Sequence, residues 1–194
     1  MAHSIACDPL PARAKAVLRE ALLAARQQLP RDDSRDARLT EQIIGLLVER
    51  APKCVAAYWP IAGEFDVRPA LERWLTLQPE GDAALPVVLA RDAPMVFHRW
   101  RPGEAVKDGR FKIPVPELEQ AVQPDMLLIP CVGIDQARFR LGYGGGFYDR
   151  TLEALGPNRP LAIGIAFDAG RVEALPHEAH DLPLDTAVTE WGTW

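Results

Sequence analysis

The stretch MLLIPCVGIDQARFRLGYGGGFYDR, residues 126–150, brings together the features that decide the fold. It begins with an unbroken apolar run, Met126–Pro130, of the kind that forms a strand covered on both faces, as in parallel sheets. Four glycines follow within the five positions 142–146. A helix is predicted directly after them, over Phe147–Leu155. The stretch therefore predicts a strand, a glycine-rich loop and a helix in succession.

Similar short apolar runs, bounded by Pro, Gly and Asp, predict further strands. They are Cys54–Tyr58, Leu85–Leu89, Met95–His98, Leu161–Phe167 and Ala187–Thr189. A helix over Val67–Leu77, capped by Asp66, lies between two of them. Strands that alternate with helices indicate an α/β fold. The Pro- and Gly-punctuated segment Arg99–Val122 is interpreted as a long surface excursion, and loops of that length are often functional.

The first fifty residues predict a pair of helices. The first is indicated by apolar residues at helical spacing and ends at Pro30. These residues are Val17, Leu18, Leu22, Ala25 and Leu29. The second is predicted over Asp33–Arg50, closed by Pro52. The predicted fold class is therefore α/β, with an open, mostly parallel sheet flanked by helices and an N-terminal helical pair.

Length and composition limit the possible functions. The chain has 194 residues, which fits a single domain over 1–194. It has 22 Lys and Arg against 27 Asp and Glu, a net charge of −5 that argues against non-specific nucleic-acid binding. No apolar run approaches the roughly 20 residues that span a bilayer, and the N-terminus has no signal-peptide pattern. Three widely spaced cysteines favour a reducing compartment, so we expect a cytoplasmic protein without membrane partners.

The glycine cluster is the strongest functional signal. Glycines free the backbone to expose successive N–H groups to an anion, and the following helix N-terminus adds donors and partial positive charge. Arg140 and Arg150 bracket this predicted phosphate site. It is not a dinucleotide fingerprint, because Phe147 stands where that motif needs glycine, and no Gly-Lys-Ser/Thr follows as in a P-loop. The alternative is a flexible glycine turn.

Aromatic and acidic residues beside the glycines extend this signal. Tyr143, Phe147 and Tyr148 offer faces on which a flat heterocycle can stack. Asp149, in the first turn of the helix, is either a structural carboxylate favoured by the helix dipole or a ligand of Mg²⁺ beside phosphates. No serine or cysteine lies in a nucleophile signature, and no residue is assigned as a general base.

Cations on the first helix form a second candidate site. Lys15, Arg19 and Arg26 are four and seven residues apart, so they fall within about 40° of one another on the helix. They border the apolar face, from which they can reach phosphates. The alternative is a solvated basic face, whose ion pairs are each worth under about 1 kcal/mol.

The end of the first predicted strand is the third candidate. Ligands of open α/β sheets bind beyond the carboxyl ends of strands. Glu64 there can accept hydrogen bonds from a substrate, and Trp59 is either a pocket wall or a core aromatic. The segment His177–His180 does not have the zinc-helix spacing, and its histidines are interpreted as surface or structural residues.

Together these segments resemble the 5-formyltetrahydrofolate cyclo-ligase family, also called 5,10-methenyltetrahydrofolate synthetase. The resemblance runs from about Lys15 to Thr189, and the glycine segment Arg140–Arg150 is its most specific part. Its other motifs are Lys15-x-x-Leu18-Arg19 with Arg26, Glu64-x-Asp66, Phe111–Pro116, Gly164–Asp168, Leu175-Pro176 and Asp181-x-Pro-Leu-Asp185. The family implies an open α/β sheet like that of sugar-phosphate isomerases and CoA transferases.

The resemblance also implies a reaction: ATP- and Mg²⁺-dependent closure of 5-formyltetrahydrofolate to 5,10-methenyltetrahydrofolate, by phosphorylation of the formyl oxygen, with release of ADP and phosphate. The implied ATP contacts are Lys15, Arg19, Arg140, Leu141, Gly142, Tyr143, Gly144, Gly145, Gly146, Phe147 and Tyr148. The implied folate contacts are Trp59, Glu64, Tyr143, Gly144, Gly145, Gly146 and Phe147. Asp149 and Asp181 match the family's magnesium positions.

Two positions depart from the family pattern. The family usually has Gly where this chain has Arg138, and often Gln where it has Gly170. Arg138 is expected to change the entry of the loop or to add a phosphate contact, and Gly170 to weaken a substrate-side hydrogen bond. Two rival functions stay open: a folate- and nucleotide-binding paralogue with a regulatory role, and an ATP-dependent enzyme acting on another small formyl or carboxyl substrate.

Overall fold

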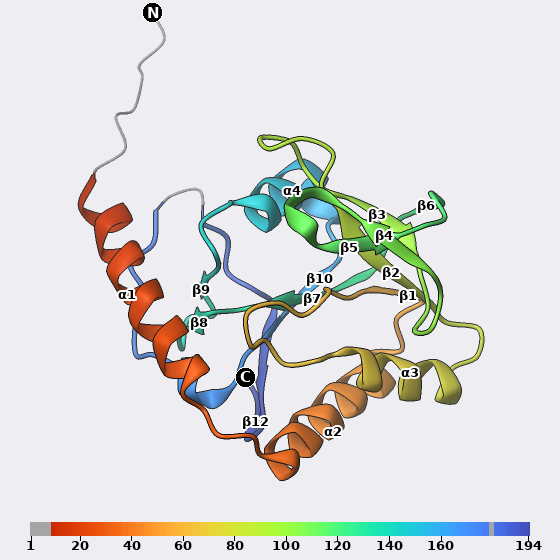
Figure 1. The fold of residues 1–194 in the computed structure, drawn as a ribbon, viewed down its shortest axis with the longest axis horizontal. Helices are drawn as coiled ribbons and strands as arrows, with labels where there is room; N and C mark the ends of the chain where they lie inside the picture. Colours follow the sequence, from red (N-terminus) through yellow and green to blue (C-terminus); the bar gives the residue numbers. More distant parts are fainter. Residues whose placement is uncertain (1–8, 179–180) are drawn as a thin grey trace, which may run out of the picture.

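The computed structural model describes residues 9–178 and 181–194 (Figure 1). Its helices are α1 (Pro9–Gln27), α2 (Asp33–Arg50), α3 (Arg68–Leu77) and α4 (Phe147–Leu155), with 3-10 turns η1 (Arg110–Lys112), η2 (Gly156–Asn158) and η3 (Asp168–Gly170). Its longer strands are β1 (Cys54–Ala56), β2 (Asp82–Val87), β3 (Val96–Arg99), β7 (Met126–Pro130), β10 (Leu161–Ile165) and β11 (Thr186–Thr189). The shorter ones are β4 (Val106–Asp108), β5 (Pro114–Pro116), β6 (Ala121–Val122), β8 (Gly133–Ile134), β9 (Arg140–Leu141) and β12 (Gly192–Thr193).

An eight-stranded sheet in the order β12-β11-β10-β7-β1-β2-β3-β6 forms the centre of the fold. The inner pairings, from β11 through β10, β7 and β1 to β2, are all parallel. The edge strands β12, β3 and β6 pair antiparallel. The predicted open, mostly parallel sheet is therefore confirmed.

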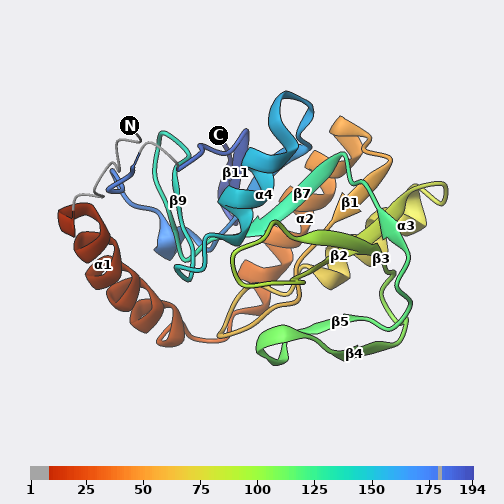
Figure 2. The same cartoon turned by 90° about the horizontal axis from the view of Figure 1, so that it is seen from above.

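Strand β7 shows why the apolar runs are unbroken. Its alternate residues Met126 and Leu128 belong to the hydrophobic cluster beneath α2 and α3, whereas Leu127 and Ile129 belong to the cluster beneath α4. Successive side chains of a strand point to opposite faces, so a strand covered on both faces has no polar position. Helices cover both faces of the sheet, as Figure 2 shows from above.

Local sequence signals account for the helix ends. Asp32 accepts hydrogen bonds from the Ser34 and Arg35 N–H groups and so caps α2, which covers the predicted range. Helix α3 begins at Arg68, one residue after the predicted start, and Val67 makes no side-chain cap. The predicted cap Asp66 accepts a hydrogen bond from the Arg68 N–H at 3.1 Å and also pairs with the Arg68 guanidinium at 2.7 Å.

Two segments differ from expectation. The first helix forms, but Leu29 lies beyond it, Val17 is 64% exposed, and none of residues 12–27 is fully buried. Figure 1 shows α1 standing apart from α2 and α3, beside the β8–β9 hairpin. The expected surface excursion is instead partly ordered as the antiparallel hairpin β4–β5, with Val115 buried (Figure 2). Periodicity predicted helix α1 correctly but not the surface that it packs against.

Candidate active site

The glycine loop joins β9 to α4 at the carboxyl-end side of the sheet. It does not leave β7 directly, because the short hairpin β8–β9 intervenes. Gly144 and Gly146 have φ of 89° and 64°, in the left-handed region where side chains are strained. Gly146 is also the N-terminal cap residue of α4 and offers no side-chain acceptor there. The first turn of α4 therefore keeps its N–H groups available, as the predicted anion site requires.

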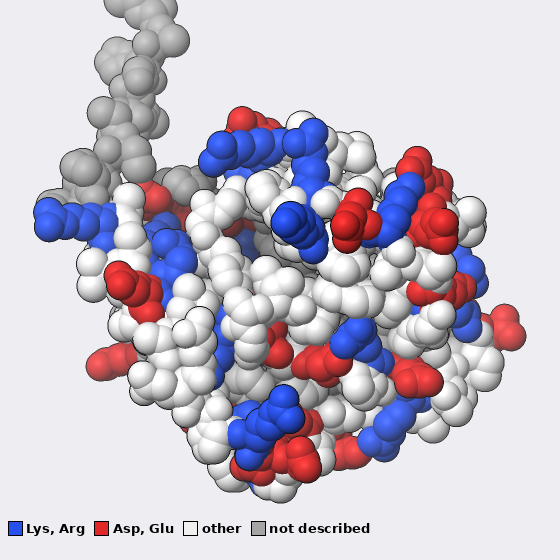
Figure 3. All heavy atoms as spheres, in the orientation of Figure 1, with Lys and Arg blue, Asp and Glu red and all other residues white. Residues whose placement is uncertain are grey.

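Two of the α1 cations hold this loop. The Arg19 Nε donates to the Gly142 carbonyl oxygen at 2.6 Å, and its guanidinium lies beside Gly144. Arg26 donates to the Tyr143 hydroxyl. Two of the three cations of the predicted stripe, Arg19 and Arg26, thus contact the glycine loop. In the space-filling view, Lys and Arg side chains lie on both sides of a hollow between α1 and α4 (Figure 3).

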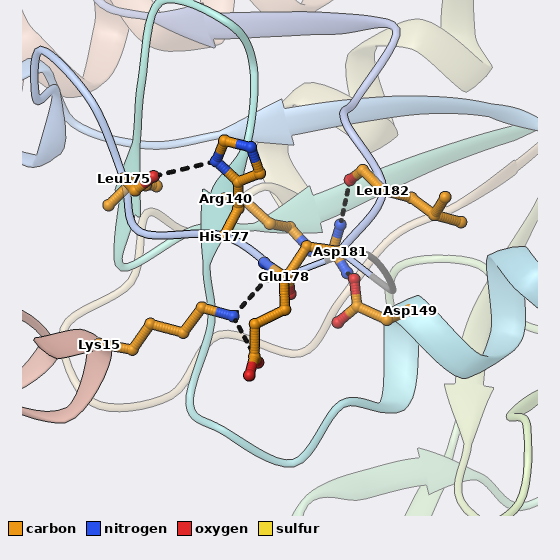
Figure 4. Close-up of polar contacts among 8 residues, drawn as sticks. All are labelled: Lys15, Arg140, Asp149, Leu175, His177, Glu178, Asp181 and Leu182. Carbon is orange, nitrogen blue, oxygen red and sulfur yellow. Dashed lines mark hydrogen bonds and ion pairs between the residues drawn. The ribbon is translucent and has the colours of Figure 1, made fainter. Parts of the chain in front are cut away.

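Lys15 reaches a different segment. Its Nζ donates to Asp181 at 2.5 Å and to Glu178 at 3.2 Å (Figure 4). Glu178 was not predicted at the site. Its position three residues before Asp181 is the feature of the sequence that could have indicated a second carboxylate there. Together the two carboxylates keep the Lys15 pKa raised above its usual value although burial acts against it. The cation therefore stays charged at neutral pH.

The two arginines that bracket the loop have separate roles. The Arg140 side chain is 5% exposed; its guanidinium pairs with Asp149 at 2.6 Å and donates to the Leu182 carbonyl at 3.4 Å (Figure 4). Arg150 donates to the Gly145 carbonyl at 2.7 Å. Both fix the loop and its flanks through protein partners. Leu141, the residue after Arg140, is buried in β9.

The carboxylates suit a metal that arrives with phosphates. Asp149 and Asp181 each contact a cation, Arg140 and Lys15 respectively. Among the described residues no group of three or more acidic, histidine or cysteine side chains can hold a metal. Mg²⁺ is usually bound through one or two carboxylates together with substrate phosphates and waters. Two carboxylates beside a predicted phosphate site are a donor set of that kind.

Glu64 lies at the end of the loop that follows β1. Its Oε2 accepts a hydrogen bond from the Ile61 N–H at 2.8 Å, and the Tyr143 side chain lies close enough to lower the pKa of its carboxylate. Burial is the larger effect and raises the Glu64 pKa to about 6, against the opposing effects of Ile61, Arg26 and Tyr143. Burial likewise raises the Tyr143 pKa to about 12. The structure thus joins the strand-end carboxylate to the glycine loop.

Some aromatic residues of the site pack against neighbours, and one of them is largely exposed. Trp59 is half-buried, lies edge-on to Trp100 with ring centres 5.8 Å apart, and has Arg68 over its ring. Phe147 faces Phe111 at 5.8 Å, and Arg150 lies over the Phe147 ring. Phe111, at the tip of the β4–β5 hairpin, is 62% exposed with a φ of 58°. It is a site-facing residue to which no role was assigned from sequence.

The histidine segment matches its structural interpretation as far as it is described. His177 stacks on Phe139 with ring centres 3.9 Å apart, and its Nδ1 lies 3.2 Å from the Leu175 carbonyl oxygen. These contacts brace the segment that carries Glu178. His180 lies outside the described residues. In the part of the chain that the structure describes, no helix combines the length and the apolar character that crossing a membrane requires.

A family model described as the 5-formyltetrahydrofolate cyclo-ligase family matches residues 11–190. The chain belongs to this family. Its curated relatives include 5-formyltetrahydrofolate cyclo-ligases from Haemophilus influenzae, 35% identical over 75% of this chain and 80% of the relative, and from Mycolicibacterium smegmatis, 31% identical over 91% and 94%. The protein is therefore a cyclo-ligase-family enzyme, as its resemblance implied.

Solved structures of cyclo-ligase relatives share the fold. The NMR structure of Aquifex aeolicus 5,10-methenyltetrahydrofolate synthetase superimposes with a TM-score of 0.74 at 31% identity, covering 92% of this chain and 91% of that one. A 5,10-methenyltetrahydrofolate synthetase from Mycoplasma pneumoniae gives a TM-score of 0.72 at 24% identity, covering 91% and 98%, which supports the fold alone.

The structure shows the surroundings of the two residues that depart from the cyclo-ligase pattern. Arg138 has a φ of 67°, a conformation that favours glycine, and its Nε donates to the Leu184 carbonyl at 3.0 Å. Its side chain thus braces the neighbouring segment. Gly170 ends η3 against Val132, and an added Cβ would lie 2.9 Å from the Val132 carbonyl oxygen.

Gly170→Ala is expected to destabilise the protein by about 1–3 kcal/mol, because the new methyl group would overlap the Val132 carbonyl oxygen. This oxygen belongs to the backbone and cannot move aside as a side chain can. The thermal midpoint should fall by about 2–4 °C for each kcal/mol. Gly45→Ala in α2, where nothing lies within 4 Å of an added Cβ, is the matched control and should be neutral or stabilising. A parent-like midpoint for Gly170→Ala would refute the packing explanation.

Proposed function

We propose that the protein catalyses the ATP- and Mg²⁺-dependent closure of 5-formyltetrahydrofolate to 5,10-methenyltetrahydrofolate, with release of ADP and phosphate. The observation that carries the proposal is the convergence of Arg19 and Arg26 from α1 on the same glycine loop that contacts Glu64. Tyr143 would thereby belong to the phosphate-binding loop and also lie beside Glu64, the carboxylate on the folate side. Residues 1–194 would act as one catalytic domain, and the expected location stays the cytoplasm.

In this proposal the nucleotide lies between α1 and the glycine loop. Lys15 and Arg19 neutralise phosphate charge, and the loop Arg140–Tyr148 supplies N–H donors and aromatic faces. Lys15 and Arg140 are held beside the site by Asp181 and Asp149, so both cations are already positioned when ATP arrives. Asp149 and Asp181 would hold Mg²⁺ together with the phosphates. The ion would supply charge neutralisation and orientation of the phosphoryl group.

The folate lies on the opposite side of the loop, against Trp59, Glu64 and the segment Tyr143–Phe147. Transfer of the γ-phosphoryl group to the formyl oxygen turns a poor leaving group into phosphate. N10 then attacks the activated carbon, and phosphate leaves. Phosphoryl transfer needs mainly positioning and charge neutralisation from the protein, and a site of cations and N–H donors provides both.

The test is to mix the purified protein with MgATP and 5-formyltetrahydrofolate and to follow the near-ultraviolet absorbance of the methenyl product. The proposal expects that absorbance to rise together with one ADP per product. ADP formation without it would favour the ATP-dependent enzyme on another formyl or carboxyl substrate. Binding of both ligands with neither product would favour the regulatory paralogue.

A further inference from the structure

The proposed ring closure has an unassigned proton. As the N10 lone pair forms its bond to the phosphorylated formyl carbon, the N10–H bond breaks and its electron pair stays on nitrogen. The C–O bond then breaks and phosphate leaves with the electrons of that bond, while the nitrogen lone pairs delocalise onto the carbon and give the N5–C–N10 amidinium. The proton must pass to a base. A positioned general base contributes roughly a hundredfold or more to such a step.

The carboxylates on the nucleotide side of the site are poor bases for this step. Asp149 is paired with Arg140, and Asp181 and Glu178 are paired with Lys15. An adjacent cation stabilises the ionised carboxylate and weakens its hold on a proton. Glu64 differs, because no cation of the described residues forms an ion pair with it: the Ile61 N–H donates to it, and Arg26 acts on it across Tyr143.

A directed chain of donors ends on Glu64. Arg26 donates to the Tyr143 oxygen, so the Tyr143 proton is free to point toward the nearby Glu64 carboxylate, whose pKa Tyr143 lowers. The chain runs from α1 across the glycine loop to the segment after β1, so it crosses the boundary between the proposed nucleotide and folate sides. It orients the carboxylate, and it favours the ionised form that can accept a proton.

The surroundings of Glu64 set its basicity. Titratable or charged groups face it from α1 (Arg26), from the glycine loop (Tyr143), from α4 (Tyr148), from the end of β1 (Tyr58) and from the residue after β7 (Cys131). Burial raises the pKa of each of these tyrosines and of Cys131, so at neutral pH they are uncharged. With a pKa of about 6, Glu64 is mostly ionised at pH 7 yet basic enough to take a proton.

We propose that Glu64 is the catalytic base that removes the N10 proton during ring closure, and that Tyr143 and Arg26 are its positioning residues. The inference rests on the proposed function. It assigns Glu64 to the second chemical step, after the phosphoryl group has been transferred, and not to recognition of the folate alone.

The test compares the two chemical steps in Glu64→Gln, which keeps the size of the side chain and removes its basicity. In rapid-quench experiments with saturating MgATP and 5-formyltetrahydrofolate, we expect an ADP burst of about one per site at a rate near that of the parent. Formation of the methenyl product should fall about a hundredfold or more. If ADP and methenyl fall together and both recover at higher folate concentration, Glu64 only binds folate and the proposal is overturned.

The pH profile gives an independent readout in a second variant. In the parent, the rate of closure should fall as the pH drops below about 6, because Glu64 becomes protonated. Tyr143→Phe removes a donor that favours the ionised carboxylate, so this acidic limb should move to higher pH. If the acidic limb does not move in Tyr143→Phe, Tyr143 is not a positioning residue of Glu64. If the acidic limb persists in Glu64→Gln, Glu64 is not the base.

Glu72→Gln is the matched control, because it makes the same chemical change at an exposed site on α3. It should leave the ADP burst, the closure rate and the acidic limb as in the parent. The parent protein shows whether a failure concerns the proposed function or the base. If the parent forms no methenyl product from MgATP and 5-formyltetrahydrofolate, the proposed function fails. A defect that is confined to Glu64→Gln concerns the base alone.

Discussion

Turnover of 5-formyltetrahydrofolate is expected to stop when EDTA is added in excess over magnesium. The proposed site brings Lys15 and Arg19 to the phosphates, but Asp149 and Asp181 add negative charge beside them. A divalent ion between phosphates and carboxylates removes that repulsion. The loss should be essentially complete and should reverse when Mg²⁺ is restored, as followed by methenyl absorbance.

Calorimetry provides the control for this prediction. Mg²⁺ alone is expected to bind weakly, since the described residues contain no group of three metal-binding side chains. Mg²⁺ with a non-hydrolysable ATP analogue should bind well, and Asp149→Asn should raise the Mg²⁺ concentration that half-maximal turnover requires. Full turnover in excess EDTA would contradict the assignment of a metal to the site.

Arg19→Ala is expected to lower the affinity for ATP by about tenfold to a hundredfold. A charge-assisted hydrogen bond to an anion contributes about 1.5–3 kcal/mol, which corresponds to that range. Arg19 also donates to the Gly142 carbonyl and lies beside Gly144, so its loss removes both a phosphate contact and a support of the loop. The thermal midpoint should change little, because no residue from 12 to 27 is fully buried.

Arg13→Ala is the control for the same helix. Arg13 is exposed and lies about 200° around α1 from Lys15, away from the glycine loop. ATP binding, measured by calorimetry at constant ionic strength, should be unchanged in this variant. If Arg19→Ala binds ATP like Arg13→Ala, α1 does not belong to the nucleotide site.

The sequence predicts those parts of the fold that local signals determine. Helix α4 has the predicted bounds, because Gly146 provides the left-handed turn before it and Gly156 the turn after it. Strand β7 also has its predicted bounds, because five apolar residues without alternation suit a strand that is covered on both faces. These features depend on a few adjacent residues.

The pairings inside the site could not be predicted in this way. Lys15 and Asp181 are 166 residues apart, and no short-range pattern specifies their contact. The hairpin β8–β9 has two-residue strands, too short for a periodicity to be visible. Glu64 was recognised as a polar residue at a strand end, but its raised pKa depends on burial by residues from several elements. Proximity of side chains in space is what the structure adds.

Helix α1 carries three of the site's cations, but none of its residues from 12 to 27 is fully buried. Its attachment relies on Lys15, Arg19 and Arg26, and on Leu22 against Gly133. Segments held by few apolar contacts open locally at a lower free energy than the core, so α1 amides should exchange hydrogen much faster than those of β7. Salt also weakens the ion pairs of Lys15, although less than it would weaken exposed pairs, so this opening should become somewhat more frequent at high salt. A nucleotide that binds only the form with α1 in place should slow this exchange. The free energy of local opening should then rise with the logarithm of the nucleotide concentration.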